Sequence, residues 1–305
     1  MTFTFALAEF IDFQDKAACE RVRRITRDEI TQHPNPDFKI QVIDEHPELF
    51  GAFATDFVQE IKQALDEGRQ FVCILPVGPV EQYPIAANMI NKFRIPMHHV
   101  HTFNMDEYAD EDANTAPGDW PGSFQKAMFD KFFYLIDEDL RPPLHQIHFP
   151  TSDNLEHYPD MMQEVGGVDV CYGGIGWCGH IAFWESSLGH EFGDDLDAYM
   201  QARARLVTLT PMTIMQNALH SFSGDWSWVP PKANTIGPAE ILLAKERSFW
   251  LDGHILGNIA WQRFIARLVA HGPVNTLVPG SILQTAPTTY TMIGGVADNV
   301  VISMR

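Results

Sequence analysis

The sequence predicts an α/β fold built on a mainly parallel, doubly wound sheet. Short apolar runs, each long enough for a buried strand, alternate along the chain with stretches of helical periodicity. The chain has 305 residues, of which 45% are hydrophobic, so it can bury a large core. A glycine cluster directly follows the apolar run from Val168 to Tyr172. Because ligands of open α/β sheets bind beyond the carboxyl ends of the strands, this loop is where chemistry is expected first.

Residues 1–47 are expected to form an N-terminal extension, and residues 48–305 a single domain. Within the extension, the stretch from Asp15 to Thr31 has helical periodicity, and Pro34-Asn35-Pro36 ends it. The stretch from Lys39 to Ile43 predicts a short strand.

The middle of the chain alternates between helices and strands. Apolar residues at every fourth position predict an amphipathic helix from Phe53 to Glu67, with Gly68 as its C-terminal cap. A buried strand from Phe71 to Leu75 comes next. The helices predicted after it are Val80 to Lys92, Phe124 to Phe133 and Leu155 to Glu164, and the strands are Met97 to Phe103, Gln146 to Phe149 and Val168 to Tyr172.

The C-terminal part continues the alternation. The helices predicted there are Met212 to Phe222 and Ile255 to Ala270. The predicted strands are Leu206 to Leu209, Ala233 to Ile236, Phe249 to Leu251 and Tyr290 to Ile293.

Composition excludes several classes of partner. The formal net charge is −19, from 40 acidic and 21 basic residues, and such a surface repels nucleic acid and anionic lipid. No apolar run is long enough to span a bilayer, and no signal peptide with a basic start opens the chain. The four cysteines lack metal-ligand spacing. We therefore expect a cytoplasmic protein without disulfides and without nucleic-acid or membrane partners.

The first candidate site is the turn after the strand that ends at Leu75. A glycine turn between a strand and a helix, here at Gly78, can hold an anion on the amides of the helix. Pro79, however, has no N–H, and Val77 and Val80 carry no hydroxyl. This turn is therefore a poor phosphate cradle, and a structural turn is the simpler interpretation.

The second candidate is the pair of adjacent carboxylates, Asp106 and Glu107, directly after the strand that ends at Phe103. A carboxylate with a raised pKa can take a proton from a carbon next to a carbonyl group. The alternative is that one acid caps the following segment and the other is solvated.

The third candidate is the glycine loop itself. His180 can relay a proton, and Glu185 can orient and polarise it. Cys178 is a potential nucleophile beside His180, or a small residue that fills a turn. The residues expected to contact the substrate are Gly78, Glu107, Gly174, Gly176, Cys178 and Gly179.

Two long motifs resemble the glucosamine-6-phosphate deaminase (isomerase) family. The run from Thr102 to Tyr108 (TFNMDEY) looks like the strand-end motif of that family. The run from Gly173 to Glu185 (GGIGWCGHIAFWE) is similar to its second motif at every spacing. The resemblance extends from about Phe71 to Asn299. Related 6-phosphogluconolactonases share the Gly-His core but lack the Asn-Met-Asp-Glu-Tyr run.

This resemblance implies a three-layer, Rossmann-like fold and a homo-oligomer that binds a small sugar or aminosugar. Asp106 would move a proton between C1 and C2 of the open-chain sugar. His180 would catalyse ring opening, with Glu185 holding it. No metal and no redox cofactor would be needed.

The departures from the family pattern concern the substrate. Cys178 stands where the family has an Asp, and Trp184, which would add bulk to the pocket, stands in place of an Asn. The phosphate loop has Pro79 and Val80 in place of glycine and a hydroxyl residue. The phosphate-binding Arg and Lys of the family fall near Ile214 and Leu256. Each lost contact to phosphate removes about 1.5–3 kcal/mol.

The sequence therefore predicts a sugar aldose–ketose isomerase or aminosugar deaminase whose substrate lacks the usual 6-phosphate contacts. One alternative is a non-catalytic sugar-binding paralogue, which the loss of the motif Asp and of the phosphate site favours. The other is a lactone hydrolase related to the 6-phosphogluconolactonases, with His180 acting on water.

Overall fold

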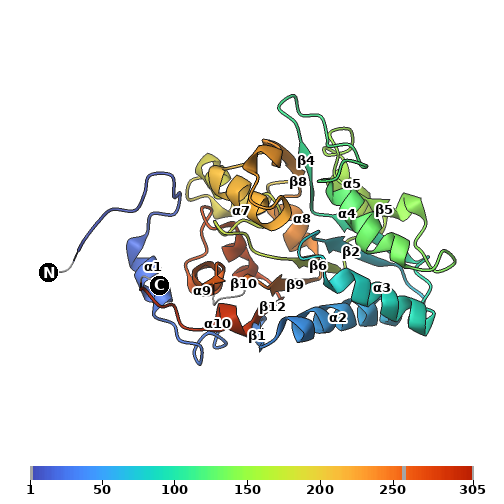
Figure 1. Ribbon diagram of the computed structural model, residues 1–305, viewed down its shortest axis with the longest axis horizontal. Coiled ribbons are helices and arrows are strands. Elements are labelled where there is room, and N and C mark those ends of the chain that lie inside the picture. Colours follow the sequence, from blue (N-terminus) through green and yellow to red (C-terminus); the bar gives the residue numbers. More distant parts are fainter. Residues whose placement is uncertain (1–2, 256–258, 304–305) are drawn as a thin grey trace.

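The computed structural model describes residues 3–255 and 259–303, and its centre is a parallel sheet of seven strands (Figure 1). Every pair of neighbouring strands in this sheet is parallel. In spatial order the strands are β1 (Phe38–Ile43), β12 (Thr288–Ile293), β9 (Glu246–Leu251), β6 (Val170–Gly173), β2 (Phe71–Leu75), β3 (Val100–Asn104) and β5 (Ile147–His148). The predicted fold class is confirmed.

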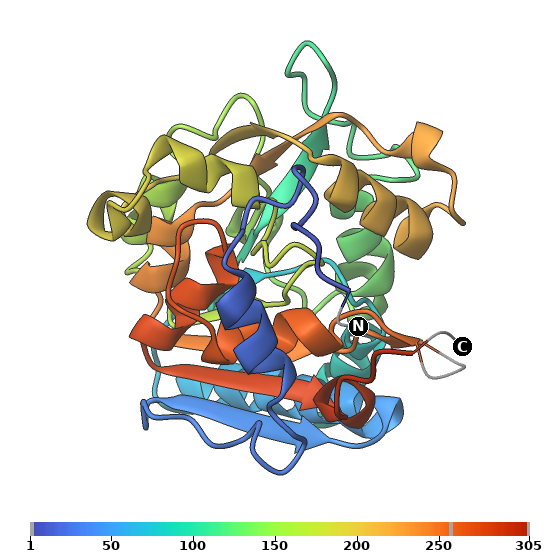
Figure 2. The same ribbon diagram turned by 90° about the vertical axis from the view of Figure 1, so that its left-hand side faces the viewer.

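Helices cover both faces of this sheet and make the three layers (Figure 2). On one face lie α2 (His46–Asp66) and α3 (Gln82–Phe93), and Tyr172 of β6 packs against Phe53 and Phe57 of α2, with ring centroids 5.2 and 5.5 Å apart. On the other face lie α9 (Arg263–His271) and the 3-10 helix η5 (Pro279–Thr285). There the Tyr290 hydroxyl of β12 donates to the Ala266 carbonyl at 3.4 Å. The buried side chains form a continuous core through these layers.

Shorter helices complete the fold. They are α1 (Lys16–Arg23), α4 (Phe124–Lys131), α5 (Tyr158–Glu164), α6 (Leu196–Met200), α7 (Pro211–Ser221), α8 (Pro238–Leu243) and α10 (Gly294–Ala297), with the 3-10 helices η1 (Phe133–Leu135), η2 (Leu144–Gln146), η3 (Ser186–Glu191) and η4 (Trp226–Trp228). Among the described residues, no helix is both long and apolar enough to cross a membrane.

The first 47 residues contribute strand β1 to the main sheet, and their helix α1 packs against α9. The short strand predicted from Lys39 to Ile43 is confirmed as β1. It lies at the edge of the main sheet and pairs with β12. The helix predicted from Asp15 to Thr31 ends at Arg23 instead, because the carboxylate of Glu29 accepts hydrogen bonds from the N–H and hydroxyl of Thr26 and closes a separate turn. The division of the chain at residue 47 stays a prediction.

A small antiparallel sheet rises beside the main one, with the order β4 (Asp106–Ala109), β8 (Lys232–Thr235) and β7 (Arg205–Thr208) (Figure 1). The strands predicted near Leu206 and Ala233 exist, but they belong to this sheet and not to the parallel one. Their apolar side chains form a second core cluster with Tyr108 and Phe183. Asp106, predicted to lie directly after the strand that ends at Phe103, is the first residue of strand β4.

The helix predicted from Ile255 to Ala270 is wrong in its first half. Residues His254–Ile255 (β10) and Ile259–Ala260 (β11) pair as an antiparallel hairpin, and α9 begins only at Arg263. The apolar periodicity of this stretch predicts a helix, although the sequence there includes Gly257 and Asn258, which are poor helix formers.

Candidate active site

The carboxyl ends of four adjacent strands of the main sheet open into one cavity of about 660 Å³. Its lining comes from the residues directly after β2, β3, β6 and β9, such as Gly78, Asp106, Gly174 and Asp252. The two candidate strand ends and the glycine loop, separated by many residues in the sequence, therefore meet at one place. This arrangement agrees with the rule that ligands of open α/β sheets bind at the carboxyl edge.

The glycine loop after β6 folds back on itself. The Gly176 N–H donates to the His180 carbonyl at 2.9 Å, and the Gly179 N–H donates to the Gly176 carbonyl at 2.9 Å. Gly179 has a φ of +87°, a backbone conformation that residues other than glycine rarely adopt. The loop thus turns sharply enough to place His180 beside the strand end from which it came.

The imidazole of His180 lies directly over Gly176. A Cβ atom at position 176 would be 1.9 Å from Nε2 of His180, so only glycine leaves room for the ring. Both residues line the cavity, and His180 is 5% exposed. Glycine at position 176 is thus required by the close approach of the histidine ring.

The other ring nitrogen of His180 faces a polar cluster behind the cavity. Nδ1 lies 3.1 Å from the sulfur of Cys178, 3.1 Å from the hydroxyl of Thr213 and 3.9 Å from Oε2 of Glu185. Burial alone would lower the pKa of His180, but Cys178, Glu185 and Asp106 raise it to about 9. Burial would raise the pKa of Cys178, and His180 outweighs it and lowers that pKa. The cluster therefore favours a thiolate beside an imidazolium.

Glu185 is fully buried and fixed by the start of α7. Its Oε1 accepts from the Thr210 N–H at 2.8 Å, and its Oε2 accepts from the hydroxyls of Thr210 and Thr213 at 3.1 and 3.0 Å. Sequence reasoning missed both threonines. The Thr-Pro pair at 210–211 marks the start of a helix in the sequence, but nothing local indicates that this start faces the glycine loop.

Asp106 is 7% exposed and lines the cavity from the first position of β4. Burial raises the pKa of Asp106 to about 8, the charge of Glu107 adds to the rise, and His180 opposes it. A carboxyl group with a pKa near neutrality can both take up and release a proton.

Glu107 turns away from the cavity, because successive side chains of a strand point to opposite faces. Its carboxylate accepts hydrogen bonds from the Ser123 hydroxyl at 2.9 Å and from the N–H groups of Phe124 and Gln125 at 3.1 and 2.8 Å. Glu107 thus anchors the N-terminus of α4 behind Asp106. For Glu107, the alternative in which one acid of the pair caps the following segment therefore holds.

The predicted substrate-contact residues divide into two groups. Gly78, Gly174 and Gly176 line the cavity. The lining does not include the other three, which lie behind it: Glu107, Cys178 and Gly179.

Of the residues that depart from the family pattern, some line the cavity and others lie away from it. Pro79 and Val80 line the cavity, whereas Ile214 packs against the second core cluster. Trp184, expected to add bulk to the pocket, is instead fully buried away from it, with its ring edge-on to Tyr199. Leu256 lies outside the described residues.

The charge of the lining is one-sided. Among the described residues that line the cavity, Glu81, Asp106 and Asp252 are acidic, and none is a lysine or an arginine. Burial raises the pKa of Asp252 to about 6; the nearby Glu81 contributes to this rise and His46 opposes it. An anionic group would find no lysine or arginine to pair with in the described lining.

One group of potential metal ligands stands out among the described residues. Cys178, His180 and Glu185 have their donor atoms within 4.8 Å of one another. Thiolate, imidazole and carboxylate are the three ligand types that bind Zn²⁺ in proteins.

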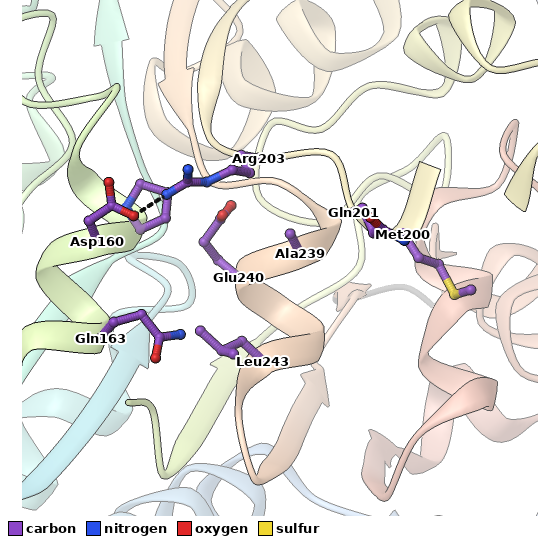
Figure 3. A pocket seen from close by; sticks show the side chains of 9 residues that line it. Asp160, Gln163, Met200, Gln201, Arg203, Ala239, Glu240 and Leu243 are labelled. Atoms are coloured by element: carbon purple, nitrogen blue, oxygen red, sulfur yellow. Dashed lines mark hydrogen bonds and ion pairs between the residues drawn. The ribbon is translucent and has the colours of Figure 1, made fainter. Parts of the chain in front are cut away.

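A second hollow of about 450 Å³ lies between α5, α6 and α8 (Figure 3). Arg203 and Asp160 point toward each other across it and form an ion pair, with Glu240 beside them. The carboxylate of Glu240 accepts from the Gly237 N–H at 2.7 Å, so it caps α8. Because Arg203, Asp160 and Glu240 are paired or used as a cap in this way, the charged groups of this hollow serve the fold.

Comparisons with known proteins agree on one kind of relative. No protein-family model matches the chain. The glucosamine-6-phosphate deaminase of Caenorhabditis elegans is 35% identical over 219 residues, which are 70% of this chain and 75% of that protein. The glucosamine-6-phosphate deaminase of Parabacteroides distasonis is 34% identical over 254 residues, which are 81% of this chain and 85% of that protein.

Solved structures support the same fold. A monomeric glucosamine-6-phosphate deaminase superposes with a TM-score of 0.71 at 23% identity, covering 85% of this chain and 99% of its own. A 6-phosphogluconolactonase from Thermotoga maritima superposes with a TM-score of 0.59 at 13% identity, covering 83% of this chain and 98% of its own.

Proposed function

The chain belongs to the glucosamine-6-phosphate deaminase family, and from this premise we propose that it isomerises or deaminates an aminosugar that carries no 6-phosphate. Membership makes the protein an enzyme of the sugar deaminase and isomerase kind. The absence of phosphate from the substrate is the finer proposal, and it rests on the lining of the cavity.

The observation that carries this proposal is the charge of that lining. Phosphate recognition depends on charge-assisted hydrogen bonds, each contributing about 1.5–3 kcal/mol. The described lining supplies Pro79 and Val80 on the loop after β2, together with three acids and no lysine or arginine. A phosphate dianion there would lack lysine and arginine contacts, with histidines such as His180 as its cationic partners, and would meet carboxylates. A neutral or cationic aminosugar avoids both costs.

In the proposed reaction, Asp106 moves the proton between C1 and C2 of the open-chain sugar. Its position in the cavity and its pKa of about 8 support this role, since a base works best when its pKa lies near the working pH. His180 opens the sugar ring through Nε2, the nitrogen beside Gly176. Glu185 holds the ring from the Nδ1 side together with Thr213. The homo-oligomer expected from the family stays a prediction.

A second candidate reaction is the hydrolysis of sugar lactones. The structural likeness to 6-phosphogluconolactonases favours it, because proteins named for that reaction share this fold. In this chain His180 would activate water. Asp106 has no role in that reaction, so its burial in the cavity speaks for the isomerase or deaminase.

The deciding experiment measures ammonia release by the purified chain from free and 6-phosphorylated aminosugars, with ketose formation followed in parallel. We expect ammonia or ketose only from a non-phosphorylated sugar. Preferred turnover of glucosamine 6-phosphate would refute the substrate proposal. Acid release from sugar lactones, with no ammonia and no ketose, would establish the hydrolase instead. Binding of a sugar without turnover would identify a non-catalytic paralogue.

A further inference from the structure

We propose that Cys178, His180 and Glu185 form a binding site for a thiophilic divalent cation such as Zn²⁺, and that the bound cation switches off the proposed sugar chemistry. The metal site rests on geometry alone. Its effect on turnover rests on the proposed function of His180.

The three donor atoms are already spaced for a metal ion. Sγ of Cys178 lies 3.1 Å from Nδ1 of His180 and 3.6 Å from Oε2 of Glu185, and the latter two atoms are 3.9 Å apart. A circle through the three atoms has a radius of about 2.1 Å, against Zn–N and Zn–O distances of about 2.0–2.2 Å and a Zn–S distance of about 2.3 Å. A cation slightly out of this plane satisfies all three distances without movement of the backbone.

The ligands are held in place by groups that the cation does not displace. The ring of His180 is confined by the close contact with Gly176. Oε1 of Glu185 accepts from the Thr210 N–H at 2.8 Å, and the hydroxyls of Thr210 and Thr213 hold Oε2 on the side that faces the sulfur of Cys178. The hydroxyl of Thr213 lies 3.1 Å from Nδ1 and 3.0 Å from Oε2, near enough to act as a weak fourth ligand. Such prior ordering lowers the entropic cost of binding.

The donor set selects a soft cation. Thiolate and imidazole favour Zn²⁺ over Mg²⁺ and Ca²⁺, which prefer sites made of oxygen atoms. The thiolate and the carboxylate of Glu185 together carry the two negative charges that neutralise a divalent ion. Cys178 is decisive, because the cluster without its sulfur retains one imidazole and oxygen atoms only.

Binding exchanges one proton for the cation. The proton shared between Sγ and Nδ1 leaves to solvent, and both atoms coordinate the metal. The neutral imidazole then keeps its remaining proton on Nε2, the nitrogen beside the cavity. The metal-free imidazolium can release its Nε2 proton and leave a neutral ring, whereas the same loss from a metal-bound ring would leave an imidazolate. Nε2 of the metal-bound ring can therefore donate a hydrogen bond, but it no longer releases and regains a proton. The ring-opening role proposed for His180 is thereby lost.

The test titrates the full-length, chelator-treated protein with Cd²⁺ and follows the ultraviolet thiolate-to-metal charge-transfer band. We expect one Cd²⁺ per chain, displaced by Zn²⁺. Cys178→Ser should abolish the band and weaken Zn²⁺ binding by about 100-fold or more. Cys19→Ser, at a buried thiol of α1 outside the site, is the matched control and should retain both. The absence of a band, or a band that persists in Cys178→Ser, would overturn the metal site.

A second measurement needs no variant. Zn²⁺ should protect Cys178 of the wild-type chain from iodoacetamide, as read by peptide mass spectrometry, and equal labelling with and without Zn²⁺ would contradict the site. Turnover of the preferred sugar should fall on addition of Zn²⁺ and return with a chelator. Unchanged turnover with one bound Zn²⁺ would overturn the switch. If no sugar is turned over, the charge-transfer band still decides the metal site, so the two proposals fail separately.

Discussion

The sulfur of Cys178 lies 3.1 Å from Nδ1 of His180, two residues further along the same loop. Residues this close in the sequence meet here because the loop closes through the hydrogen bond from the Gly176 N–H to the His180 carbonyl. The contact occupies the side of the ring away from Gly176, which leaves Nε2 for the cavity. The acid–base behaviour of His180 is therefore coupled to a thiol and a carboxylate that a substrate in the cavity does not touch.

Replacement of Asp106 by asparagine should abolish turnover and stabilise the fold at alkaline pH. The folded-state pKa of Asp106, about 8, lies far above its ordinary value of 3.8, so the wild type loses stability as the pH rises from about 4 to about 8. The uncharged amide of the variant has no such cost. In thermal melts, the melting temperature of the variant relative to the wild type should be higher at pH 9 than at pH 5.

The matched control for this variant is Asp112→Asn, at an exposed acid of the loop after β4, which should melt like the wild type at both pH values. Near-normal turnover in Asp106→Asn would refute the role of Asp106 as the base.

The rate should depend on pH through Asp106 and respond to Glu107. If the ionised form of Asp106 is the base, kcat/KM rises with pH through about 8. Glu107→Gln removes a neighbouring negative charge, lowers the pKa of Asp106 and moves this rise to lower pH. Stability should fall by about 1–3 kcal/mol, because the amide replaces a carboxylate that accepts from Ser123 and the start of α4.

The pH–rate profile of Glu107→Gln is measured beside that of Glu111→Gln, at an exposed acid in the loop after β4. An equal shift in the control would mean that net charge, and not the contact with Asp106, sets the profile.

Thr213→Val should lower kcat with little change in KM. The substitution removes the hydroxyl that contacts both His180 and Glu185, so the imidazole loses its orientation while the cavity lining is kept. A loss of about tenfold or more corresponds to a hydrogen bond to a charged group, about 1.5–3 kcal/mol. Thr213→Ser retains the hydroxyl and should restore most of the rate. A rise in KM with unchanged kcat would show that Thr213 serves binding and not the positioning of His180.

Gly176→Ala should disable the site without unfolding the chain. The added Cβ would lie 1.9 Å from Nε2 of His180 and would push the ring out of its position. Activity should fall to background while the far-ultraviolet circular dichroism spectrum stays that of the wild type.

Gly51→Ala, in helix α2, is the control for Gly176→Ala. Nothing lies within 4 Å of a Cβ at that position, and alanine is favoured over glycine in helices by about 0.5–1 kcal/mol, so this variant should be active and slightly more stable. Wild-type activity in Gly176→Ala would show that the ring can move without loss of function.

Much of the fold follows from local patterns. Buried strands such as Phe71–Leu75 are continuous apolar runs, and α2 repeats its apolar residues every turn, so each element is recognisable from its own residues. The parallel arrangement then brings the carboxyl ends of the strands together, which is why Asp106 and His180 are predicted to share a site before any contact is known. The hairpin before α9 escapes prediction because apolar periodicity alone does not separate a helix from two short strands.

The sequence by itself determined the fold class, the strand ends that carry chemistry and the residue types at the site. Only the tertiary structure decided how these residues divide their roles: Glu107 caps α4, Trp184 packs away from the cavity, and Thr213 joins His180 to Glu185. The physical reason is the range of the interactions. Propensity and periodicity act over a few residues, whereas a buried hydrogen bond between the β6 loop and α7 exists only once the whole core has packed.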